Sequence, residues 1–178
     1  GARPGNAVAA LSIRDDGGLE PALAAAIHEG PAAILPTAKR QHGHCAVVSP
    51  DNRTVFVCDL GLDRIMAYKL PGKGEGLMLA ATPFTQLPEG AGPRHLSFHP
   101  NGKIAYVINE LNSTISVLDY TPDSAGLAIV QTLPTLPEGF ADTNTCAEIA
   151  VRADGRFLYG SNRGHNSIVS YAIKDSGE

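Results

Sequence analysis

GPRHLSFHPNGKIAYVINELNSTISVLDY, residues 92–120, holds three short apolar runs separated by two turns. The runs cover residues 96–98, 104–108 and 114–118, and the turns between them contain Pro, Asn, Gly and Ser. Runs of this length that are rich in β-branched and aromatic residues are typical of strands, and turns this tight join strands as antiparallel hairpins. The stretch therefore predicts three consecutive antiparallel strands.

The same pattern occurs twice more, at residues 44–70 and 148–173, with a period of about 50 residues. One place in the first turn is held by Asp51, Asn101 and Asp154. One place in the third run is held by Ile65, Ile115 and Ile168. Agreement at several fixed offsets favours a true structural repeat over a β-sandwich with accidental internal similarity.

A fourth apolar run completes the repeating unit. It ends in the same four residues in two units, LPEG at 87–90 and LPEG at 136–139. Four strands per unit at this period are typical of a β-propeller blade. The sequence therefore predicts an all-β fold, a β-propeller of four-stranded antiparallel blades.

The repeat divides the chain into four parts of one propeller domain. Residues 1–38 are expected to form the third and fourth strands of a blade and a loop, 39–90 and 91–140 one blade each, and 141–178 a partial blade. About 3.5 blades are then present, whereas closed rings have about four to eight. Because an open ring exposes strand edges, we expect a chain truncated at both ends. The remaining blades of the same protein, or a second copy, would close the ring.

The N-terminal part is the least regular. Residues 6–13 match the third strand of the unit, and residues from 19 onward are expected to form an outer strand. Alanines around 22–26 also suit a short helix, but the repeat favours a strand. Residues 30–40 are expected to form a loop.

Composition excludes several classes of protein. Of the 178 residues, 43% are hydrophobic and 18% are charged, which is typical of a globular chain. A net charge of −4 gives no reason to expect a nucleic-acid partner. No apolar run approaches the ~20 residues that cross a bilayer, so no membrane partner is expected.

Three cysteines, Cys45, Cys58 and Cys146, lack metal-ligand spacing. Their odd number favours a reducing compartment, so a cytoplasmic location is expected, although pairing between Cys45 and Cys146 stays open. The chain has no phosphate-binding glycine loop, nucleophile elbow or metal-ligand cluster, so no cofactor and no metal are expected.

Charge changes from blade to blade at a few places near the strand ends. The place of Arg94 is held by His44 one unit earlier, and that of His95 by Glu148 one unit later. After the second strand, Leu60, Glu110 and Arg163 share one place. Structural places tend to repeat in kind, as the isoleucines do, so these variable places are candidates for a site.

The stretches HGHCAVVSPD, CDLGLDRIMAYKL, GPRHLSFHPNGKIAYVINELNSTISVLDY and NTCAEIAVRADGRFLYGSNRGHNSI together resemble the lactonase family of seven-bladed propellers. That family includes bacterial-type 6-phosphogluconolactonases and fungal 3-carboxy-cis,cis-muconate lactonising enzymes. The resemblance covers nearly the whole chain. It implies that the chain holds roughly half of a seven-bladed ring.

The resemblance also implies a site in the central channel. The family's channel-lining His, Arg, Glu and Arg fall on His44, Arg94, Glu110 and Arg163, which are the implied catalytic residues. Flanking candidates for substrate binding are His42, His95, Glu148, Asn162 and His165. His28 lies outside any motif and is expected at the surface.

Three functions remain open. A lactonase would hydrolyse a small anionic sugar lactone, 6-phosphoglucono-1,5-lactone, in carbohydrate metabolism through the pentose phosphate pathway, with Glu110 or His44 activating water. A muconate cycloisomerase would use the same cationic channel for carboxylates. A propeller without catalysis would only bind a ligand or protein. Arg94 and Arg163 could instead form ion pairs with Glu110 or Glu148 that tie neighbouring blades together.

Overall fold

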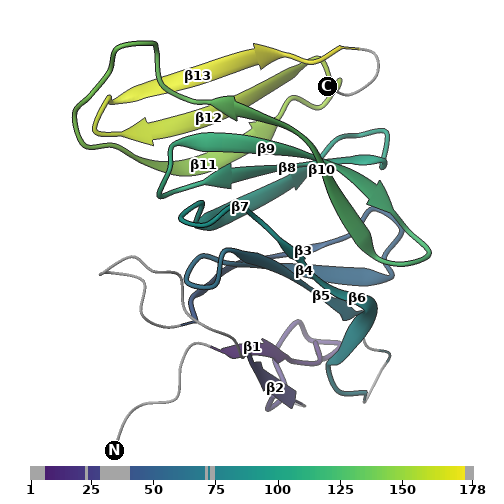
Figure 1. Cartoon of the computed structure of the whole chain (residues 1–178). Coiled ribbons are helices and arrows are strands. Elements are labelled where there is room, and N and C mark those ends of the chain that lie inside the picture. Colours follow the sequence, from purple (N-terminus) through teal and green to yellow (C-terminus); the bar gives the residue numbers. More distant parts are fainter. Residues whose placement is uncertain (1–6, 23, 29–40, 71, 73–74, 175–178) are drawn as a thin grey trace, which may run out of the picture.

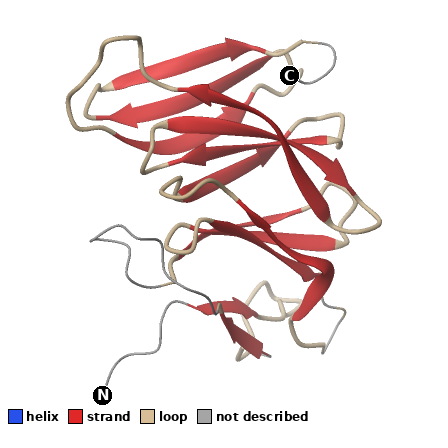
Figure 2. Ribbon diagram, viewed as in Figure 1, coloured by secondary structure: helices blue, strands red, loops and turns tan. Residues whose placement is uncertain are grey.

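The computed structural model describes residues 7–22, 24–28, 41–70, 72 and 75–174. Figure 2 shows strands and loops and no helix in the part of the chain that is described. In Figure 1 the antiparallel sheets follow one another as layers, from the N-terminal to the C-terminal part of the chain. The predicted all-β fold of repeated antiparallel units is confirmed.

Each sheet is built from consecutive strands, as a propeller blade is. The first contains β1 (Ala7–Ala10) and β2 (Ala24–Ile27). The second contains β3 (Gly43–Val48), β4 (Thr54–Asp59), β5 (Arg64–Lys69) and β6 (Met78–Gln86). The third contains β7 (Pro93–Phe98), β8 (Ile104–Asn109), β9 (Thr114–Thr121) and β10 (Gly126–Pro134). The fourth contains β11 (Thr145–Val151), β12 (Phe157–Arg163) and β13 (Ser167–Ala172).

The alanine-rich segment near the N-terminus is a strand, as the repeat predicted. β1 pairs with β2 in antiparallel register, with Ala7 opposite Ile27. Helix propensity of the alanines is therefore overridden by strand pairing. The loop expected at residues 30–40 lies outside the described residues.

Packing between blades explains why the middle blade is so apolar. Ala105 and Val107 of β8 belong to the core shared with the second sheet. Tyr106 and Ile108 of the same strand belong to the core shared with the fourth sheet. Alternate side chains of a strand point to opposite faces. A strand covered on both faces needs apolar residues at every position, and β8 is buried throughout.

The residue that follows each fourth strand is buried against the next blade. His28, Leu87 and Thr135 hold this place, and each is less than 4% exposed. The Oγ1 atom of Thr135 donates a hydrogen bond of 2.8 Å to Asn162 of the next sheet. Nδ1 of His28 bonds Asp59 of its next sheet in the same way. The expectation that His28 lies at the surface is therefore wrong.

The three cysteines are free thiols. The bond between Cys45 and Cys146 that the sequence left open is not formed. Cys58 is fully buried in the core between the second and third sheets, and burial raises the pKa of its thiol well above the usual range. Cys58 therefore acts as a small apolar core residue.

Candidate functional site

A bridged ion pair joins the third and fourth sheets. Glu110 forms ion pairs with two guanidiniums: its Oε2 lies 2.8 Å from Nε of Arg94, and its Oε1 lies 2.8 Å from Nη2 of Arg163. The side chains of Arg94 and Glu110 are 16% and 19% exposed, and that of Arg163 is 49% exposed. The structure thus brings together three of the four catalytic candidates, and both arginines pair with Glu110 as the structural alternative required.

Register shifts near the starts of β3, β7 and β11 direct several of the candidate side chains toward the site. The register shifts between Gly43 and Cys45 in β3, between Pro93 and His95 in β7, and between Cys146 and Ile149 in β11. A bulge bends the strand and redirects the side chain of the extra residue. His44, Arg94 and Glu148 all lie within these shifts, so one repeated backbone feature presents three of the candidates.

Glu110 and Arg163 lie at the other half of the site, where the second strands end. β8 ends at Asn109 and β12 ends at Arg163. In an antiparallel blade the end of the second strand lies beside the start of the first. The guanidinium of Arg94 also donates to the backbone oxygen of Ala147 at 2.9 Å, and that of Arg163 donates to the backbone oxygen of Cys146 at 3.0 Å. Both arginines are therefore held to β11 as well as to Glu110.

A row of imidazoles extends the site toward the second sheet. The ring of His44 lies 5.0 Å from that of His95 and 5.8 Å from that of His42, measured between centroids. His95 contacts Nη1 of Arg94 through Nε2 at 3.2 Å, and its Nδ1 lies 2.8 Å from Oε1 of Glu148. His44 thus joins the ion-pair cluster through His95.

The environment of His44 favours its neutral form. Burial, followed by electrostatic interaction with Arg94 and His95, lowers the pKa of His44 below its usual range, against a smaller opposing effect of Glu110. Its Nδ1 atom is buried and has no hydrogen-bond partner among the described residues. The site therefore offers an uncharged imidazole near the Arg94 guanidinium.

Glu148 is exposed to solvent and stays ionised. Its side chain is 64% exposed. Burial acts to raise the pKa of Glu148, but hydrogen bonds from His95 and from the amide of Ile149 outweigh burial, so the pKa lies below its usual range. Glu148 can therefore orient the His95 ring by accepting from Nδ1.

Two of the flanking candidates lie apart from this cluster. Asn162 is 4% exposed, and its amide group bonds Thr135 and Asn144 between the third and fourth sheets. The ring of His165 packs edge-on against Phe140, with 4.8 Å between centroids, and its Nδ1 lies 2.7 Å from Oγ of Ser167. In the described part of the chain, the side chains of Asn162 and His165 form no hydrogen bond or ion pair with Arg94, Glu110 or Arg163.

The sequence did contain a sign that Asn162 is structural. The place before the variable Leu60, Glu110 and Arg163 is held by Asp59, Asn109 and Asn162, and all three are buried. Their side chains bond within the following turn, to the next strand of the same blade, or to the neighbouring blade. A place that repeats in kind serves the fold, by the same reasoning that singled out the variable places.

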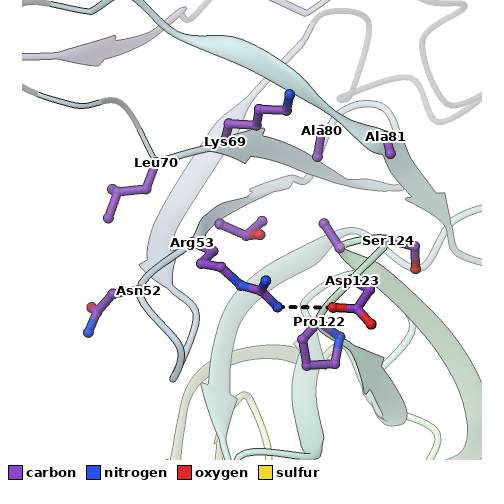
Figure 3. A pocket seen from close by; sticks show the side chains of 11 residues that line it. Asn52, Arg53, Lys69, Leu70, Ala80, Ala81, Pro122, Asp123 and Ser124 are labelled. Carbon is purple, nitrogen blue, oxygen red and sulfur yellow. Dashed lines mark hydrogen bonds and ion pairs between the residues drawn. The ribbon is translucent and has the colours of Figure 1, made fainter.

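A second concavity lies at the opposite end of the blades. Its volume is about 480 Å³, and it is lined by the β3–β4 turn, the facing ends of β5 and β6, and the β9–β10 turn (Figure 3). Arg53 reaches across it to Asp123 at 3.4 Å and also pairs with Asp51 at 2.8 Å. The charges of Arg53 and Lys69 are thus balanced by two carboxylates, Asp51 and Asp123.

The arrangement around Glu110 suits small anions. Two guanidiniums can hold a carboxylate or phosphate, or stabilise an oxyanion that develops in a reaction. The neutral imidazole of His44 can accept a proton from water. Sequence reasoning found these groups, but not the backbone oxygens of residues 146 and 147 that fix the arginines, because backbone groups have no sequence pattern of their own.

Comparison with known proteins agrees with this chemistry. The family model for Lactonase, 7-bladed beta-propeller, matches residues 4–178. A protein of Bacillus subtilis named 6-phosphogluconolactonase is 35% identical over 167 residues, which are 93% of this chain and 46% of the relative. A protein of the same name from Enterobacter is 42% identical over 134 residues, 75% of this chain and 40% of the relative.

Solved structures agree as well. The periplasmic gluconolactonase of Pseudomonas aeruginosa is 34% identical, with a TM-score of 0.91 over 99% of this chain and 49% of that one. The chain spans about half the length of the curated relatives it matches. Among the residues that the structure describes, no helix is long and apolar enough to cross a membrane. The repeat, the four-stranded blades and the match over residues 4–178 show that the chain belongs to the lactonase family of seven-bladed β-propellers.

Proposed function

We propose that the protein hydrolyses a small anionic sugar lactone, and that this lactone is 6-phosphoglucono-1,5-lactone. The observation that carries the proposal is the neutral His44 imidazole near Arg94 and Glu110, with Arg163 paired to the same Glu110. The names of the Bacillus and Enterobacter relatives support the choice of substrate. The two guanidiniums can bind a negatively charged group of the ligand.

His44 is the proposed general base, and Glu110 is not. Both carboxylate oxygens of Glu110 already form ion pairs with guanidiniums. The pKa of His44 instead lies below its usual range, so its imidazole is neutral at pH 7 and can take a proton. Glu110 then sets the positions of the two arginines.

The reaction follows from these roles. A water molecule attacks the lactone carbonyl carbon while His44 takes one of its protons. The carbonyl oxygen becomes an oxyanion, and the arginines stabilise its charge. The bond between the carbonyl carbon and the ring oxygen then breaks, and the proton on His44 passes to the ring oxygen. The product is an open-chain hydroxy acid, which ionises to a carboxylate.

The test compares substrates and a matched pair of arginines in the complete protein. Turnover of 6-phosphogluconolactone, corrected for spontaneous hydrolysis, is measured beside that of carboxymuconate. Arg94→Ala should lower kcat/KM by ~10²-fold or more, as removal of an oxyanion donor does. Arg53→Ala removes an arginine at the other end of the blade, and its activity should equal that of the wild type. Turnover of carboxymuconate alone would make the protein a cycloisomerase instead, and turnover of neither would support a binding propeller.

We propose a cytoplasmic location, supported by three unpaired thiols. The Pseudomonas relative is periplasmic by name, so location differs within the family or this protein shares that compartment. Cell fractionation with an antibody against the protein decides between the two. Recovery in the periplasmic fraction would refute the proposal.

A further inference from the structure

We infer that Asp63, a residue outside the cluster, is a positioning residue that sets the place of Arg94 and Glu110. The inference rests on the proposed function for its activity readout. Asp63 lies in the turn between β4 and β5, on the second sheet, whereas Arg94 and Glu110 belong to the third. Its side chain is buried, with the residue 2% exposed.

The carboxylate of Asp63 holds the segment that leads into β7. Its Oδ2 accepts from the amide of Gly90 at 2.8 Å, and its Oδ1 accepts from the amide of Gly92 at 2.6 Å. The backbone oxygen of Asp63 accepts from the amide of Leu87 at 2.9 Å. Bonds from amides to an ionised carboxylate are short and strong. Asp63 therefore fixes the connection between blades two residues before Arg94.

The same segment is joined on its other side to Glu110. The backbone oxygen of Gly92 accepts from the amide of Glu110 at 2.8 Å. The backbone oxygen of Glu110 accepts from the amide of Cys146 at 3.1 Å, and that of Cys146 accepts from Arg163 at 3.0 Å. One hydrogen-bonded chain thus runs from Asp63 through the backbone of the site to Arg163, across three sheets.

The backbone of Gly92 makes this close approach possible. Gly92 has φ +63°, and a Cβ atom there would come within 2.5 Å of Cγ of Leu111. Only glycine adopts such a conformation readily in so small a space. The position of residue 92 is therefore closely defined by its surroundings, and Asp63 supplies the charged anchor.

The residue at the equivalent place one blade later holds its segment by different hydrogen bonds. Ser113 holds that place, and its Oγ accepts from Nδ2 of Asn144 at 2.9 Å, in the segment before β11. The side chain of Ser113 makes only neutral bonds, whereas the Asp63 carboxylate makes two charged ones. The stronger anchor therefore precedes Arg94, the more buried of the two arginines.

The test uses Asp63→Asn and Asp63→Ala in the complete protein. Asp63→Asn keeps one acceptor for Gly92 but presents its NH₂ group to the Gly90 amide, and Asp63→Ala removes both acceptors. Because a displacement of about 1 Å can cost ~10²-fold in rate, we expect ~10-fold lower kcat/KM in Asp63→Asn and ~10²-fold in Asp63→Ala. Asp51→Asn changes a turn carboxylate at the far end of the same sheet and should leave activity unchanged.

A double-mutant cycle separates positioning from a general structural role. If Asp63 acts through the cluster, Asp63→Asn added to Arg94→Ala should lower kcat/KM no more than ~2-fold further. A full additional ~10-fold loss in the double mutant would overturn the inference.

Hydrogen exchange gives a second readout that needs no activity. In Asp63→Asn, the amides of Gly90, Gly92 and Glu110 should exchange faster, while those in the turn at residues 99–102 should not change. Unchanged exchange at residues 90 and 92, or a uniform rise across the blade, would overturn the inference. Absence of turnover in the wild type would instead refute the proposed function, and exchange would still decide the role of Asp63.

Discussion

Replacing Glu110 by Gln removes one charge from the centre of the site and keeps the shape of the side chain. The Gln oxygen can accept from one guanidinium, but its NH₂ group must then face the other. The pair of Glu110 with Arg94 is mostly shielded from water, at 19% and 16% exposure, and the pair with Arg163 is half exposed.

These exposures set the expected loss of stability. Leaving a shielded charged group without its partner costs about 1–3 kcal/mol or more. A solvent-exposed ion pair contributes about 0.2–1 kcal/mol because water and salt screen it. We therefore expect Glu110→Gln to lower the free energy of unfolding by about 2–3 kcal/mol, and Arg163→Gln by less than about 1 kcal/mol.

Urea unfolding of both variants at pH 7 measures the loss of stability, and initial rates of lactone hydrolysis on the folded fraction measure activity. Since a domain is typically stable by about 5–15 kcal/mol, Glu110→Gln should still fold. Its kcat/KM should fall by ~10²-fold because the arginines lose their common partner. If Glu110→Gln unfolds while the folded remainder keeps full activity, Glu110 is only a strut between blades. A cost in Glu110→Gln no larger than in Arg163→Gln would refute the argument from exposure.

Two further outcomes follow from buried polar groups. The pKa of His44 lies below its usual value of about 6.5. We therefore expect kcat/KM to stay level from pH 7.5 to about 6.5 and to fall only at lower pH. The variant His44→Gln should lose this fall at low pH, and an inflection above about pH 6.5 would contradict the assignment of His44 as the base. The same shift has a stability consequence: as pH falls through this range the unfolded chain takes up the His44 proton first, so the contribution of His44 to stability is present above about pH 6.5 and lost below, as urea titrations should show. Thr135→Val should lower the free energy of unfolding by about 1–3 kcal/mol because the buried Asn162 oxygen loses a donor. Thr135→Ser keeps that hydroxyl and should cost clearly less, and equal urea midpoints for the two variants would contradict this account.

Local patterns predicted the strands because strand and turn preferences act over a few residues. The isoleucines at one repeat place lie in β5, β9 and β13, as the 50-residue period requires. The repeated LPEG shows where such patterns mislead. It begins directly after β6 but one residue beyond the end of β10, with Thr135 between. A sequence repeat is aligned by residue identity, whereas strands are paired by hydrogen-bond register, and the two need not coincide.

The sequence by itself determined the repeated blades, the polar turns, and the small set of places whose charge differs between blades. Only the tertiary structure decided that Glu110 takes both Arg94 and Arg163, that His28 is buried against Asp59, and that Asp63 holds the segment before Arg94. These contacts join different sheets. Their geometry depends on how large side chains in the shared cores space and rotate the blades, and on bulges that redirect single residues. A strand pattern records which residues face inward, but not the partner that packing places opposite them.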